Sequence, residues 1–90
     1  MNPKRIRKLR RRILQLRLGK ANVADRELRS LARSVGRVAV KRGKHPTYEK
    51  EGRPPLPIPG HSRQMSPITV ENVLDMLEED LDYEEGMADG

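Results

Sequence analysis

The sequence predicts an α+β fold in the order helix, helix, three short antiparallel strands, helix, with the helices packed on one face of a small sheet. The first and last thirds carry apolar residues at helical spacing, and the middle third alternates apolar and polar residues. With 90 residues the chain has room for one small domain. It contains no Phe, Trp or Cys, so we expect a modest core of Leu, Val and Ile, without disulfides or thiolate metal sites.

The first helix is expected over residues 4–18, with Gly19 as its stop. Its apolar stripe consists of Ile6, Leu9, Ile13 and Leu16, and arginine dominates the opposite face. Such a helix can contact RNA, lie on a membrane surface or fill a partner's groove. It can equally pack its stripe on the domain and leave the arginines in water. We predict that residues 1–20 form a basic amphipathic extension.

Two further helices are indicated by caps and by spacing. Asn22 is a candidate N-cap for the second helix, which Gly36 ends. Either Ser66, with Pro67 at the first helical position, or Thr69 can cap the last helix. The apolar stripes of these two helices are Leu28, Leu31, Ala32 and Val35, and Val70, Val73, Leu74, Leu77 and Leu81.

Residues between these helices are typical of strands. Residues 37–41 and 45–50 are expected to form a hairpin around a turn at 42–44. The prolines at 55, 57 and 59 remove hydrogen-bond donors from one edge only, while Leu56 and Ile58 keep theirs on the other edge. We therefore interpret residues 54–59 as an edge strand rather than as a polyproline ligand of the SH3 type.

The charge is unevenly distributed along the chain. Residues 1–45 hold sixteen Lys/Arg and two Asp/Glu, whereas residues 46–90 hold three Lys/Arg and eleven Asp/Glu. A polarised basic half is typical of nucleic-acid binding. The acidic half is either a solvated tail or a counter-charge that folds back, and we predict a disordered acidic tail at 83–90 after a single domain at 21–82. No membrane span and no secretory signal are expected, which favours the cytoplasm.

Candidate chemistry is confined to two histidines. No metal-ligand spacing, phosphate-binding loop or nucleophile triad is present in the sequence. Lys41, Arg42 and Lys44 lead directly into His45, so phosphate oxygens could be held beside an imidazole that moves protons near neutral pH. RNA carries its own nucleophile in the 2′-hydroxyl, so one such base suffices. The alternative is an exposed loop histidine without a chemical role.

Residues 23–81 resemble the HicA-like toxins of bacterial toxin–antitoxin pairs. The matching motifs are a turn, Gly43-Lys44-His45-Pro46-Thr47-Tyr48, and a strand end, Pro59-Gly60-His61-Ser62, which are followed by Thr69 and Val73-Leu74. Lys44 stands where the family usually has Ser, and residues 65–69 depart from the family's lysine-rich lead into the last helix. The resemblance implies a double-stranded-RNA-binding-domain-like fold, ribosome-independent mRNA cleavage and a HicB-like antitoxin partner.

We therefore expect a toxin-like mRNA interferase, a metal-independent endoribonuclease that needs no cofactor and uses His45 as its catalytic acid/base. It would form a homo-oligomer or a toxin–antitoxin hetero-oligomer, and no membrane partner is expected. One alternative is a non-catalytic RNA-binding protein that uses the same surface, and another is an adaptor led by the N-terminal helix. The expected RNA-binding residues are Lys41, Arg42, Gly43, Lys44, Tyr48, His61 and Arg63.

Overall fold

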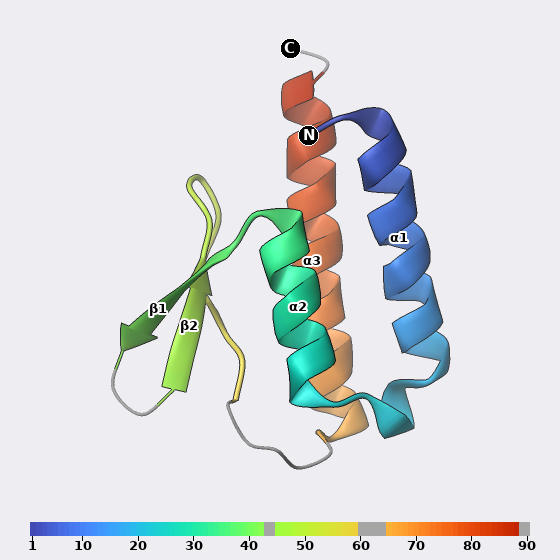
Figure 1. Ribbon diagram of the computed structural model, residues 1–90, viewed down its shortest axis with the longest axis vertical. Helices are drawn as coiled ribbons and strands as arrows, with labels where there is room; N and C mark the ends of the chain where they lie inside the picture. The colour runs from blue at the N-terminus through green and yellow to red at the C-terminus, as the bar shows by residue number, and fades with distance from the viewer. Residues whose placement is uncertain (43–44, 60–64, 89–90) are drawn as a thin grey trace.

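The predicted α+β order is confirmed. The computed structural model describes the backbone of residues 1–42, 45–59 and 65–88, and side chains at 1–41, 46–59 and 65–87. Two helices, α1 (Pro3–Leu18) and α2 (Asp25–Val35), are joined through a short 3₁₀ turn, η1 (Lys20–Asn22). The strands β1 (Val38–Arg42), β2 (His45–Glu49) and β3 (Leu56–Pro57) follow, and α3 (Pro67–Ala88) closes the chain. Figure 1 shows α2 between the sheet and α1, with α3 running along both helices.

The strands form one antiparallel sheet in the order β1-β2-β3. Tyr48 pairs with Ala39 on one side and with Leu56 on the other, so these three residues share one face of the sheet, and Tyr48 and Leu56 are buried on it. Leu56 and Ile58 are buried on this face, and the Ile58 N–H donates to the Pro46 carbonyl. The predicted edge position of the proline segment is thus confirmed, but the strand covers only Leu56–Pro57 of the predicted 54–59. Val38 lies on the opposite face, where its side chain is 66% exposed.

Helix α1 belongs to the same core as the rest of the domain. Its whole apolar stripe is buried, with Ile13 completely inaccessible, and α1 packs along α3. The expectation that residues 1–20 form an extension of the domain is therefore wrong. The stripe cannot serve a membrane or a partner's groove, because α3 already covers it. In the part of the chain that the structure describes, no helix is long and apolar enough to cross a membrane.

The caps of α2 and α3 explain where these helices begin and end. Helix α2 starts after Ala24 rather than at Asn22, and the Glu27 carboxylate accepts the Ala24 N–H at 2.9 Å. Gly36 ends α2 in the left-handed conformation, at φ 107°. At the start of α3 the Ser66 hydroxyl accepts the Thr69 N–H at 3.2 Å, so Ser66 is the cap and Pro67 the first helical residue.

Helix α3 continues well beyond Leu81, where the sequence predicts a disordered tail. Its last turns carry Glu84, which forms an ion pair with Lys50, and Glu85, which forms one with Arg10. Tyr83 lies so close to the β2–β3 turn that a Cβ atom on Gly52 would collide with its ring. The acidic segment up to residue 88 is therefore a helix that other elements hold in place. This corrects the predicted tail over residues 83–88, and residues 89–90 lie outside the described residues.

Candidate nucleic-acid interface

The β1–β2 hairpin brings part of the predicted site together. In the strand register Arg42 lies directly opposite His45, and Lys41 lies opposite Pro46. Lys41 is exposed to solvent. Four other predicted site residues lie outside the described residues. They are Gly43 and Lys44 of the hairpin turn, and His61 and Arg63 after the proline segment.

Tyr48 does not belong to a surface site. Its side chain is 1% exposed and lies on the covered face of the sheet, so its ring is not available for stacking on a base. The guanidinium of Arg33 lies 5.9 Å from the centre of the Tyr48 ring, a cation–π arrangement. The predicted RNA contact by Tyr48 is therefore wrong. In a chain with no Phe or Trp, a strand tyrosine at the centre of the sheet is needed as core volume.

A buried ion pair positions the strand that begins at His45. Arg37 is almost fully buried, and its Nε and Nη2 atoms donate to the two carboxylate oxygens of Asp80 at 2.5 and 2.8 Å. Its Nη1 atom donates to the carbonyl of Tyr48 at 2.7 Å and to that of Pro54 at 2.8 Å. One side chain therefore joins α3 to β2 and to the segment before β3, and the hairpin is fixed relative to the helices.

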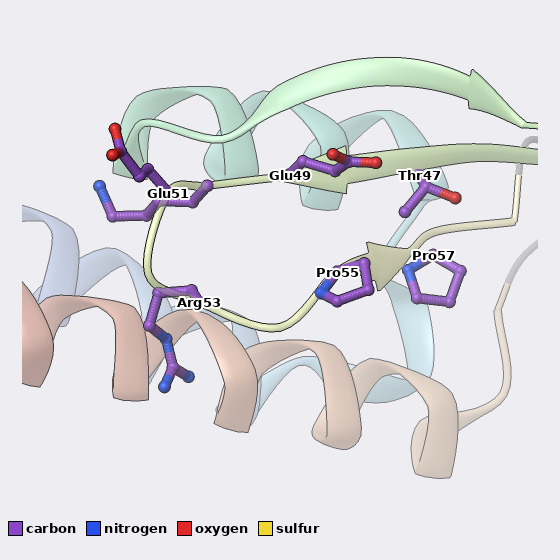
Figure 2. Close-up of a pocket in the computed structure, with 7 residues that line it drawn as sticks. Thr47, Glu49, Glu51, Arg53, Pro55 and Pro57 are labelled. Atoms are coloured by element: carbon purple, nitrogen blue, oxygen red, sulfur yellow. The ribbon is translucent and has the colours of Figure 1, made fainter.

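Arg53 shares the same carboxylate from the more exposed side. Its Nε atom donates to Asp80 at 2.8 Å, and its Nη2 atom lies 3.2 Å from Glu79. The hydrogen bond to Asp80 raises the pKa of Arg53 above its ordinary value. Figure 2 shows Arg53 pointing from the β2–β3 loop toward α3. Asp80 is thus neutralised by two arginines, one just before β1 and one in the turn after β2.

Helix α3 also neutralises one side of α1. Five of its carboxylates are spaced four, three, four and three residues apart, which places them on one helical face. Arg17 forms ion pairs with three of them, and Arg10 with the remaining two at 2.7 Å. The five residues are Glu71, Asp75, Glu78, Asp82 and Glu85. The acidic half is therefore a folded-back counter-charge, the alternative that the sequence analysis did not favour.

The cations that remain without a carboxylate partner are concentrated on α1 and α2. Among the residues whose side chains the structure describes, six on α1 lie outside every ion pair, and so do two exposed arginines of α2 and Lys41 of β1. Sequence reasoning placed the interface at the hairpin and did not include most of these residues. They are Lys4, Arg5, Arg7, Lys8, Arg11 and Arg12 of α1, and Arg26 and Arg33 of α2.

A depression on the open side of β2 and β3 is a poor site for a phosphate. It is lined by Thr47, Glu49, Glu51, Pro55 and Pro57, together with Lys50 and Arg53 (Figure 2). Lys50 and Arg53 are engaged by the carboxylates of α3, so the lining offers an anion no unpaired cation. Among the described residues, no group of three or more His, Asp or Glu side chains is arranged to hold a metal ion.

No protein-family model matches the chain, and neither a curated protein nor a solved structure does. The functional argument therefore depends on the residues of this chain and on their arrangement.

Proposed function

We propose that the protein binds RNA and cleaves it as a toxin-like mRNA interferase. The observation that carries the proposal is the register of the hairpin, which sets His45 opposite Arg42. The neighbouring pair in the register is Lys41 with Pro46, and Lys41 is exposed. A histidine and cations at one hairpin end supply the two things that RNA cleavage needs, a proton acceptor and charge for the phosphate. The α2-β1-β2-β3-α3 order also agrees with the fold that the HicA-like resemblance implies.

In the proposed reaction His45 takes the proton from an RNA 2′-hydroxyl. The 2′-oxygen then attacks the adjacent phosphorus, the bond from phosphorus to the 5′-oxygen breaks, and the departing oxygen takes a proton from water. Lys41 and Arg42 hold the phosphate oxygens while negative charge develops on them. A HicB-like antitoxin that covers this hairpin is part of the same proposal.

A second candidate is a non-catalytic RNA-binding protein. It is favoured by the position of the unpaired cations among the side chains that the structure describes, most of which lie on α1. The third alternative from the sequence, an adaptor that uses the apolar stripe of α1, is excluded because that stripe is buried in the core.

The two candidates are separated by incubating purified protein with RNA and following the fragments on a gel. We expect His45→Ala to abolish cleavage while the protein keeps its fold and its affinity for RNA. His61→Ala serves as the matched control, since it removes the other histidine, and we expect it to reduce cleavage less. If folded His45→Ala cleaves at the parental rate, the catalytic assignment is wrong. If the wild-type protein binds RNA and does not cleave it, the non-catalytic candidate is correct.

A further inference from the structure

The outer surface of α1 carries a straight row of unpaired cations. Lys4, Lys8 and Arg12 are spaced four residues apart, so they follow one line along the helix, and all three are exposed. We call these three residues the α1 row. At 1.5 Å per residue the row is about 12 Å long. A shallow depression lined by Asn2, Lys4, Arg5 and Lys8 lies at its start.

The α1 row is unfavourable for the isolated helix. Like charges four residues apart repel each other, and this applies to Lys4 with Lys8 and to Lys8 with Arg12. Lys4 and Arg5 lie in the first turn of α1, at the positive end of the helix dipole, and this turn contains no acidic residue that would offset their charge. The carboxylates of α3 pair with Arg10 and Arg17 on another side of α1 and do not relieve this repulsion. A bound polyanion would relieve both effects.

Exposed cations continue from α1 across α2 toward the hairpin. Arg5 donates from its Nη2 atom to the Ser34 carbonyl at 3.0 Å, so this flank of α1 adjoins the end of α2. On α2, Arg26 and Arg33 are exposed, and Arg33 reaches over the Tyr48 ring of β2. Lys41 follows on β1. In Figure 1 α1 and the hairpin lie on opposite sides of the molecule with α2 between them.

We propose that the α1 row is a second RNA-backbone contact, which binds nucleotides beyond those held at the β1–β2 hairpin. This inference depends on the proposed function, and it adds that the preferred substrate is an RNA long enough to reach both sides. The molecule measures 39 × 30 × 17 Å. At about 3.4 Å of axis per nucleotide, the spacing of a helically stacked strand, roughly nine nucleotides cross its 30 Å width.

RNA fits this surface better than a lipid membrane does. A helix that lies in a membrane interface inserts an apolar face among the acyl chains. The apolar stripe of α1 is buried against α3, which leaves only Leu14 and Leu18 exposed near the helix end, beyond the α1 row. A surface of cations without an apolar face is suited to phosphate groups in water.

The test compares two RNAs, one of about 20 and one of about 5 nucleotides, because only the longer one spans the molecule. Both carry 2′-O-methyl groups, which remove the attacking hydroxyl, so binding is measured without cleavage. The test variant is Lys4→Gln, Lys8→Gln, Arg12→Gln. The matched control is Arg10→Gln, Arg17→Gln, Lys20→Gln, which removes the same charge from cations that α3 already neutralises. A charge-keeping variant, Lys4→Arg, Lys8→Arg, Arg12→Lys, should restore binding.

We expect the wild-type protein to bind the longer RNA at least about tenfold more tightly than the shorter one. The test variant should lose most of this difference, and its slope of log affinity against log salt should be shallower by about 2. If the folded test variant binds the longer RNA with wild-type affinity and slope, the α1 row is not a contact, although the proposed function stands. If the wild-type protein binds neither RNA, the proposed function fails and this inference fails with it. Binding to phosphatidylserine vesicles that the longer RNA does not displace would overturn the inference in favour of a membrane.

Discussion

Arg37 and Asp80 form a bidentate ion pair in which both side chains are completely buried, although the two residues lie 43 positions apart in the sequence. Removing one partner of such a pair leaves an uncompensated charge in the interior, which typically costs about 3–5 kcal/mol. The pair also holds the strand that begins at His45 against α3. The ion pair therefore stabilises the fold and also fixes the position of the strand that carries His45.

The first prediction concerns this pair. Asp80→Asn should lower the free energy of unfolding by about 3 kcal/mol or more, because Arg37 and Arg53 both lose their counter-charge. The matched control is Asp82→Asn, two residues further along the same helix, where the side chain is 64% exposed and the expected loss is at most about 1 kcal/mol. Urea denaturation of both variants measures the difference. Equal midpoints for the two variants would show that the buried pair contributes no more than a surface pair.

The second prediction concerns the approach of the β2–β3 turn to α3. Gly52 has φ 82°, and an added Cβ atom would collide with the ring of Tyr83. Gly52→Ala should therefore destabilise the protein by more than about 1 kcal/mol, from backbone strain and steric overlap together. Gly86, in the last turns of α3, has open space around it, so Gly86→Ala should stabilise by up to about 1 kcal/mol. Thermal unfolding checks the opposite signs, and a neutral Gly52→Ala would mean that Tyr83 does not pack there.

The third prediction concerns the end of α3. Truncation after Leu81 removes Asp82, Tyr83, Glu84 and Glu85, and we expect it to destabilise the protein by about 1–3 kcal/mol. Truncation after Ala88 is the control and should have no effect on stability. The comparison is made by chemical denaturation. A solvated tail, in contrast, would give equal midpoints for both truncations.

The fourth prediction concerns acid pH. A hydrogen bond from Lys50 lowers the pKa of Glu84 below its ordinary value of 4.5. Because the folded-state pKa is depressed, the resulting stabilisation is present above about pH 4.5 and is lost as the pH falls through the folded-state pKa. Glu84→Gln should therefore be less stable than the parent at neutral pH, and this difference should shrink on acidification below that value. Glu51→Gln, on the exposed turn, is the control for the loss of a carboxylate and should change the stability at neutral pH by less than Glu84→Gln does. A stability difference for Glu84→Gln that stays constant from pH 7 to 3 would contradict the assignment.

Local patterns in the sequence predicted the helices and strands. Ion pairs between residues far apart in the sequence determine how these elements are held together, and local patterns did not predict them. The stripe of α1, the Ser66 cap and the alternation of Leu56 and Ile58 depend on neighbours within a few residues, and the structure confirms all three. The pairs Arg37–Asp80 and Lys50–Glu84 join residues 43 and 34 positions apart, and no local spacing marks such partners.

One long-range feature did leave a signal in the sequence. The carboxylates of α3 recur at steps of four and three, and Arg10 and Arg17 are seven residues apart on α1. Two helical faces of opposite charge predict two helices packed side by side. Counting the acidic residues as a block, rather than by their helical spacing, led to the prediction of a tail. Of the candidate site, the strand register pairs the backbones of Arg42 and His45, and the role of either residue in binding or cleavage stays a prediction. The burial of Tyr48 depends on the whole fold.

The salt dependence of RNA binding measures whether the cations that α3 leaves unpaired hold RNA phosphates. Affinity of the full chain for RNA is measured over a series of salt concentrations. If four to six phosphates are neutralised, log affinity should fall against log salt with a slope of about −3 to −4 for single-stranded RNA. A slope near zero would contradict the account, because it would leave the unpaired cations without a role in binding nucleic acid.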